Sequence, residues 1–297
     1  MANFARSAAT PLADSVVSTR TEISIELAGV CGHSTPASFL IPKKSEGPVS
    51  VSTEMRGNAV VVTLRWTDKR NALSAADADV LAAAISVAAE EPEARALILT
   101  GEGTFSAGGD LPYFAGLGRT LAPEEIHQTI YRRVQGIIRA LRDCPVPTIA
   151  AVDGAAIGLG MDLALACDMR FVGPNGFLMQ GWARAGLIAG TGGVALLHRI
   201  QPDLIWKLLA DQEKLTAERA SELGLAEVGS PDAMSSALER VDALSYMSRT
   251  VLSKYAVLAR RAAWPSDDNF DKAGEIQGGL LGSEDVRALT EKLLGKS

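Results

Sequence analysis

Two glycine-rich stretches decide the fold of this chain: Phe105-Ser-Ala-Gly-Gly-Asp-Leu111 and Asp153-Gly-Ala-Ala-Ile-Gly-Leu-Gly-Met-Asp-Leu-Ala164. Each follows an apolar run, Ala96-Leu-Ile-Leu-Thr100 or Val146-Pro-Thr-Ile-Ala-Ala-Val152, which predicts a strand, a glycine turn and a helix. The first N–H groups of a helix have no partner within that helix, so each junction presents backbone donors. Two such junctions predict a paired oxyanion hole, which stabilises negative charge on a carbonyl oxygen.

Composition excludes several classes of function. The chain has 297 residues, of which 47% are hydrophobic and 22% charged, as in an ordinary soluble globular protein with a substantial core. A formal net charge of -6 argues against nucleic acid binding. Asp153, Asp162 and Asp168 interrupt the longest apolar stretches, so none supplies the ~20 residues of a membrane span.

Cysteine and histidine are scarce and carry no recognisable motif. The three cysteines form neither a C-x-x-C pair nor an even set, so no disulfide framework or zinc site is indicated and a reducing, cytoplasmic compartment is expected. The three histidines lie in no H-E-x-x-H motif, and the chain has no nucleophile elbow. We expect no metal, so carbonyl chemistry would depend on carboxylates and backbone.

The chain divides into three predicted parts. Residues 1–52 lack sustained periodicity, which indicates a mostly disordered extension, a transit peptide or an over-long gene start. Residues 53–200 predict an α/β core with strands at 58–66, 94–100, 146–152 and 169–172, and helices at 75–90, 123–142 and 159–167. Beyond Gly190 the pattern is wholly helical, and residues 201–297 form a helical region with segments at 203–212, 216–223, 232–262, 270–281 and 284–294.

Five stretches follow one another in a characteristic order: Lys69-Arg-Asn-Ala-Leu-Ser74, Thr100-Gly-Glu-Gly-Thr-Phe-Ser-Ala-Gly-Gly-Asp110, Val152-Asp-Gly-Ala-Ala-Ile-Gly-Leu-Gly-Met-Asp-Leu-Ala-Leu-Ala-Cys-Asp168, Leu215-Thr-Ala-Glu-Arg-Ala-Ser-Glu-Leu-Gly-Leu225 and Ser283-Glu-Asp-Val-Arg287. Over about residues 57–297 the chain resembles the crotonase superfamily, the enoyl-CoA hydratases and isomerases. The resemblance implies an α/β fold, the crotonase-type ββα spiral with a C-terminal helical trimerisation region. It also implies a homotrimer or dimer of trimers and an acyl-CoA substrate, with coenzyme A as part of the thioester and no other cofactor.

By this resemblance, the oxyanion donors are the backbone N–H groups of Gly109 and Leu159. Leu159 stands where the family usually has glycine, which is tolerable because the donor belongs to the backbone. Ala107, Gly108 and Gly158 complete the loops that face the substrate. The alternative is that these glycines only make tight turns and close helix packing.

Asp162 matches one of the two catalytic carboxylates of the hydratases. It lies three residues after Leu159, which places its carboxylate on the same helical face, one turn further on. A carboxylate beside an enolising thioester can take or return the α-proton if burial raises its pKa against the helix N-terminus, which lowers it. The alternative is an acidic residue of the kind favoured in any first helical turn.

Trp182 matches the second hydratase carboxylate, so the second catalytic glutamate is missing. Indole cannot exchange a proton as an acid or base near neutral pH, which compromises hydration by two carboxylates. The tryptophan would instead form a wall of the acyl pocket, or be a core residue. Chlorobenzoyl-CoA dehalogenases are similar in having tryptophan there, but their nucleophilic aspartate would align with Gly190. Arg184 is a candidate partner for a substrate carboxylate, or a solvated surface residue.

The resemblance also implies how coenzyme A is held. Lys69 and Arg70 would supply charge for the phosphates, the backbone around Ala72 would meet adenine, and Lys296 would reach the nucleotide of a neighbouring subunit. Asp110 matches the end of the family's A-G-x-D motif and is expected to hold its loop. His127 borders the acyl channel in the family, although a lone helix histidine is more often at the surface.

These residues favour an acyl-CoA enzyme of the hydratase/isomerase type, a lyase or isomerase, with one carboxylate as acid and base. Two alternatives remain open. One is a non-catalytic protein that binds acyl-CoA, which Trp182 supports. The other is a C–C bond hydrolase or isomerase of the same fold, because these reactions share the enolate.

Overall fold

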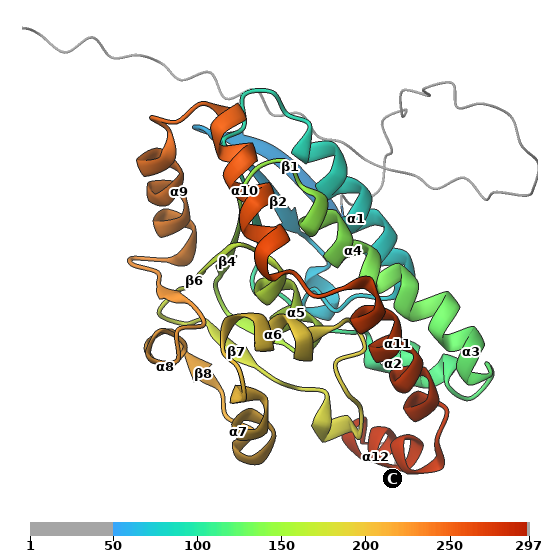
Figure 1. Ribbon diagram of the computed structural model, residues 1–297. Helices are drawn as coiled ribbons and strands as arrows, with labels where there is room; N and C mark the ends of the chain where they lie inside the picture. The colour runs from blue at the N-terminus through green and yellow to red at the C-terminus, as the bar shows by residue number, and fades with distance from the viewer. Residues whose placement is uncertain (1–49, 296–297) are drawn as a thin grey trace, which may run out of the picture.

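The computed structural model describes residues 50–295, in which helices pack on both faces of a six-stranded sheet (Figure 1). Its strand order is β1-β2-β3-β4-β6-β9, and a second sheet has the order β5-β7-β8. In the large sheet β1 runs antiparallel to β2, and the other neighbours are parallel. The strands are β1 (Val51–Arg56), β2 (Ala59–Leu64), β3 (Ala96–Gly101), β4 (Thr148–Val152), β5 (Ala155–Ile157), β6 (Met169–Val172), β7 (Phe177–Met179), β8 (Leu215–Thr216) and β9 (Glu227–Val228).

The central strands β2, β3 and β4 are mostly apolar, and both of their faces are buried. In β2, Val60 and Val62 belong to the main core, whereas Ala59 and Val61 belong to the core that α9 covers. The helices are α1 (Ala75–Ala89), α2 (Leu111–Leu117), α3 (Pro123–Ile126), α4 (Arg132–Asp143), α5 (Leu159–Ala166), α6 (Gly193–Ile200), α7 (Leu204–Asp211), α8 (Ala217–Glu222), α9 (Ala233–Leu244), α10 (Arg249–Ala263), α11 (Asp267–Leu281) and α12 (Glu284–Leu293).

The long helix predicted at 123–142 is continuous but not regular. Between α3 and α4 the chain makes a π-helical turn over His127–Tyr131, and α11 packs along this turn. α1 lies beside α4 and covers the main core (Figure 1). Within residues 50–295, no helix has the length and apolar character needed to cross a membrane.

The prediction of a wholly helical chain after Gly190 is wrong. β8 pairs with β7 and β9 pairs with β6, and each of these strands has only two residues, too few for a periodic pattern. The predicted helix 232–262 is two helices, because Ser248 is extended and its hydroxyl accepts a hydrogen bond from the Val251 N–H at 3.3 Å, which starts α10 afresh.

The predicted extension 1–52 also ends too late. Val51 and Ser52 belong to β1, which is held by its antiparallel pairing with β2. Only Val51 in this strand is buried, so the sequence shows no clear alternation of apolar and polar residues. Residues 1–49 lie outside the described residues, as does Lys296.

Candidate functional site

Backbone hydrogen bonds join the two glycine-rich junctions. The Ser106 N–H donates to the Ala155 carbonyl at 2.8 Å, and the Ile157 N–H donates to the Ser106 carbonyl at 3.1 Å. A Cβ on Gly160 would lie 2.5 Å from the Ser106 oxygen, so glycine lets the start of α5 approach the first loop. The junctions that follow β3 and β4 therefore form one site.

Two backbone donors of this site are free. Among residues 50–295, the N–H groups of Gly109 and Leu159 have no hydrogen-bond acceptor. Their neighbours are paired: the Ala107 N–H donates to the Arg70 carbonyl and the Gly158 N–H to the Met179 carbonyl, each at 2.9 Å. These free donors are the two that the sequence predicted for the oxyanion hole.

Gly108 brings the two donors together. Its φ of 104° lies in the left-handed region, and a Cβ on it would lie 2.5 Å from the Ile157 oxygen and 3.5 Å from the Leu159 nitrogen. A side chain at this position would separate the loops, so the site requires glycine here. The Gly108 N–H is itself paired, since it donates to the Ser106 Oγ at 3.1 Å.

Asp162 lies one turn into α5, and its side chain is buried. Its Oδ2 accepts hydrogen bonds from the indole Nε1 of Trp182 at 3.2 Å and from the hydroxyl of Thr191. A Cβ on Gly193 would overlap the carboxyl group, so the Gly190-Thr-Gly-Gly193 turn both binds Asp162 and makes room for it. Burial raises the Asp162 pKa to about 6, although the hydrogen bonds from Thr191 and Trp182 lower it.

Trp182 lies between the two junctions. Its indole would be 3.3 Å from a Cβ on Gly109 and 3.5 Å from a Cβ on Gly158, and only 6% of the residue is exposed. It is therefore a buried residue that also forms a wall beside the free donors. The resemblance matched Trp182 to the second catalytic carboxylate, and nothing in the sequence indicated that the indole donates to Asp162.

The residues expected to hold coenzyme A differ in their contacts within the fold. The Lys69 ammonium lies 2.6 Å from an Asp77 carboxylate oxygen and 3.5 Å from an Asp110 oxygen, so two carboxylates already bind it. Arg70 is exposed and left-handed, with a φ of 53°. The Ala72 N–H donates to the Lys69 carbonyl at 3.0 Å, which keeps this loop tight.

Two further candidates have structural partners. Asp110 caps α2, because its Oδ1 accepts the Tyr113 N–H at 3.1 Å, as expected for a residue that holds its loop. Arg184 is exposed and donates to the side chain and carbonyl of Gln212, at 3.3 and 3.2 Å. Arg184 thus lies at the protein surface, next to the end of α7.

His127 is buried, with 5% exposed, so the surface position typical of a lone helix histidine does not apply here. The same helix carries Tyr131, whose ring would lie 2.9 Å from a Cβ on Gly190. Sequence reasoning missed Tyr131, Thr191 and Gln277. Only the Gly190-Thr-Gly-Gly193 turn gave a signal, because its glycines indicate that another segment packs closely against the backbone there.

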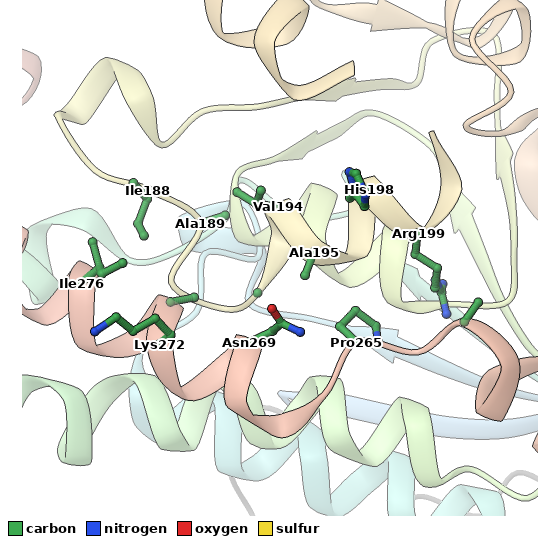
Figure 2. Close-up of a pocket in the computed structure, with 13 residues that line it drawn as sticks. Ile188, Ala189, Val194, Ala195, His198, Arg199, Pro265, Asn269, Lys272 and Ile276 are labelled. Carbon is green, nitrogen blue, oxygen red and sulfur yellow. The ribbon is translucent and has the colours of Figure 1, made fainter. Parts of the chain in front are cut away.

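A hollow of about 560 Å³ lies between α6 and α11, separate from the free donors. Figure 2 shows Val194 and Ala195 on one side, and Asn269, Lys272 and Ile276 on the other. It does not include Gly109, Leu159 or Asp162. Within the described part of the chain, no group of three or more His, Cys, Asp or Glu side chains is placed to hold a metal ion.

Comparison with known proteins identifies one family. The enoyl-CoA hydratase/isomerase family model matches residues 54–263. A probable enoyl-CoA hydratase, echA14, of Mycobacterium tuberculosis (strain CDC 1551 / Oshkosh) is 33% identical over 228 residues, which cover 76% of this chain and 86% of that protein. A probable enoyl-CoA hydratase of Rhodobacter capsulatus is 35% identical over 186 residues, covering 62% of this chain and 69% of that protein.

Solved structures agree with the fold. The crystal structure of an enoyl-CoA hydratase/isomerase from Mycobacterium paratuberculosis superposes with a TM-score of 0.73 at 26% identity, covering 84% of this chain and 100% of that chain. The likeness confirms the α/β, crotonase-type architecture predicted from the sequence.

Proposed function

Because the chain belongs to the enoyl-CoA hydratase/isomerase family, we propose that it stabilises the enolate of an acyl-CoA thioester with the N–H groups of Gly109 and Leu159. Asp162 is the single acid and base. One observation carries this proposal: two linked junctions hold two free donors, and one of these, the Leu159 N–H, lies one helical turn from a buried carboxylate. Arg70 is the exposed cation available to the coenzyme A phosphates.

The raised pKa suits Asp162 to this work. With a pKa of about 6, the carboxylate is mostly ionised at neutral pH and is more basic than an ordinary aspartate. It takes a proton from the α- or γ-carbon, and the electron pair of the broken C–H bond moves to the thioester oxygen. The two N–H groups stabilise that negative charge. Returning the proton to a different carbon shifts the double bond.

Proton transfer fits this pocket better than hydration. Adding water across a double bond in this family's manner uses a second carboxylate, and Trp182 stands in its place. The indole donates a hydrogen bond to Asp162 and exchanges no proton near neutral pH. Cleavage of a C–C bond shares the same enolate and is the alternative reaction.

Exchange of α-protons in D₂O tests the enolate directly. We expect NMR to show deuterium entering the α-position of a saturated acyl-CoA, at a rate that depends on enzyme concentration. Loss of the enoyl absorbance of crotonyl-CoA would indicate hydration. Absence of both signals across short, medium and aromatic acyl-CoAs, with binding retained, would contradict the catalytic proposal.

A non-catalytic acyl-CoA binder is the second candidate, and the Trp182–Asp162 hydrogen bond favours it. A carboxylate that already accepts two hydrogen bonds on Oδ2 has less capacity to take a proton. The exchange experiment separates the two functions, because a binder holds the thioester with no incorporation of deuterium.

Trp182→Phe tests how the indole acts on Asp162. Loss of the N–H donor removes a contact that favours the carboxylate, so the Asp162 pKa should rise further. We expect the acidic limb of the exchange-rate profile to move to higher pH, with the rate at pH 5.5 falling about tenfold. Trp206→Phe is the matched control, because Trp206 is 72% exposed. An unmoved acidic limb in Trp182→Phe would exclude this role.

We also propose that three chains associate through α10. Val251, Tyr255 and Leu258 follow one another at helical spacing and are 43%, 64% and 63% exposed, which is unusual for an apolar stripe. Leu258→Glu should lower the mass measured by light scattering from three chains to one. Val87→Glu, at an exposed apolar position on α1, is the control and should leave the mass unchanged. Retention of the trimer in Leu258→Glu would exclude this interface.

A further inference from the structure

Three polar side chains lie buried where the π-helical turn meets α11. His127, Tyr131 and Gln277 are 5%, 1% and 0% exposed. Among residues 50–295, neither His127 ring nitrogen has a hydrogen-bond partner, and the same holds for the Tyr131 hydroxyl and Gln277 Nε2. Buried polar groups are nearly always paired in folded proteins, so four such atoms in one place require an explanation.

The packing brings these groups together. Gly190 is in contact with both Tyr131 and Gln277: a Cβ there would lie 2.9 Å from the tyrosine ring and 2.6 Å from the Gln277 Cβ. A Cβ on Gly274, one turn before Gln277, would lie 3.0 Å from His127 Nε2. We call His127, Tyr131 and Gln277 the polar cluster.

A neighbouring buried amide does have partners. Gln135, one turn after Tyr131 on the same helix, is fully buried, and its Nε2 donates to the Gly190 and Phe270 carbonyls at 2.8 and 2.7 Å. The Gln277 amide is fixed because its Oε1 accepts the Ile188 N–H at 2.7 Å, and its Nε2 is left free. Burial raises the pKa of Tyr131, whereas the adjoining Gln277 side chain lowers it, and the net rise keeps the hydroxyl protonated as a donor.

The polar cluster lies next to the proposed base. Gly190, which Tyr131 and Gln277 contact, directly precedes Thr191, whose hydroxyl donates to Asp162. Consecutive Cα atoms are about 3.8 Å apart, so the residue that contacts the cluster is the direct neighbour of the residue that binds the Asp162 carboxyl group. Trp182 occupies the side of Asp162 next to Gly109 and Gly158. The polar cluster therefore adjoins the turn that holds Asp162.

We propose that the polar cluster binds an uncharged oxygen substituent, a ketone or hydroxyl, on the acyl chain beyond its reacting carbons. This inference rests on the proposed acyl-CoA function. The Gln277 amide and Tyr131 hydroxyl both donate, and one nitrogen of a neutral histidine donates as well, so an oxygen acceptor satisfies them. No lysine or arginine belongs to the cluster, and Asp162 is near, so a buried carboxylate would lack the cation it needs.

Binding affinities test the proposal with three probes of equal chain length. Isothermal titration calorimetry with hexanoyl-CoA, 5-oxohexanoyl-CoA and adipoyl-CoA compares no substituent, a ketone and a carboxylate. We expect the ketone to bind about tenfold tighter than the unsubstituted chain, and Tyr131→Phe to reduce that ratio several-fold. Tyr246→Phe removes the hydroxyl of an 84% exposed tyrosine and should leave the ratio unchanged.

Three results would overturn the inference. Equal affinity for hexanoyl-CoA and 5-oxohexanoyl-CoA would show that the cluster recognises no oxygen, and a preference for adipoyl-CoA would show that the ligand is charged. In both cases the proposed function would survive, because acyl-CoA still binds. If no acyl-CoA binds at all, the proposed function fails and this inference fails with it.

Thermal stability gives a readout that does not depend on the probes. If the Tyr131 hydroxyl is unpaired in the free protein, Tyr131→Phe removes a buried polar group without a partner, and the melting temperature should rise by about 2–4 °C. A fall in melting temperature would show that the hydroxyl is paired in the fold, and would overturn its assignment to ligand binding.

Discussion

Replacing Asp162 by asparagine should lower the rate of α-proton exchange by roughly 10²–10⁴-fold, with acyl-CoA affinity nearly unchanged. Asparagine keeps the shape of the side chain and can still accept the hydrogen bonds from Thr191 and Trp182, but it cannot take a proton. The measurement is exchange in D₂O, with calorimetry for binding. Asp211→Asn, at an exposed carboxylate that pairs with Lys207, is the control.

The same substitution should remove a pH dependence of the stability of the folded protein. Burial raises the Asp162 pKa from 3.8 to about 6, so ionisation costs more in the folded protein than in the unfolded chain. Stability is therefore fully present below pH 3.8, is lost as the pH rises toward 6, and stays reduced above it. The loss is on the order of 3 kcal/mol. Asp162→Asn should thus be more stable than wild type at pH 8, and about equal to it at pH 4.

Two results would contradict the assignment of Asp162. Exchange that continues at the wild-type rate in Asp162→Asn would place the base elsewhere. A wild-type stability that does not fall relative to the variant between pH 4 and pH 8, measured by urea unfolding, would show that the carboxyl group is not the buried titrating group.

Local features of this site were predictable from the sequence. The resemblance to the crotonase superfamily named the Gly109 and Leu159 donors, a glycine turn before a helix accounts for the free N–H of Leu159, and the position of Asp162 relative to Leu159 follows from the helical repeat. In each case the residues that decide the geometry lie within a few positions of one another. The strands β2, β3 and β4 were predictable for the same reason, since a mostly apolar run marks a strand buried on both faces.

Contacts between distant segments were not predictable. Lys69 is bound by Asp77 and Asp110, and Arg184 donates to Gln212, and the sequence indicated neither set of partners. The hydrogen bond from Trp182 to Asp162 depends on how the chain folds back after β7. The polar cluster depends on α11 packing against a π-helical turn, and an irregular turn within a helix leaves no periodic signal.

Leu159→Pro should reduce proton exchange by roughly 10²–10³-fold, because it removes one of the two oxyanion donors. Leu159 is the first residue of α5, a position where proline is tolerated since the N–H has no partner within the helix. The proline ring also fills the space that the thioester oxygen would occupy. The rate is measured by exchange in D₂O, and binding is measured with a saturated acyl-CoA.

Two variants separate the lost N–H from the lost side chain. Leu159→Ala keeps the donor but truncates a fully buried residue, so it should lower stability by about 2–5 kcal/mol and leave most of the exchange rate. Glu284→Pro places proline at the equivalent first position of α12, which tests tolerance of the substitution itself. If Leu159→Ala loses as much exchange activity as Leu159→Pro while remaining folded, the backbone donor is not what stabilises the enolate.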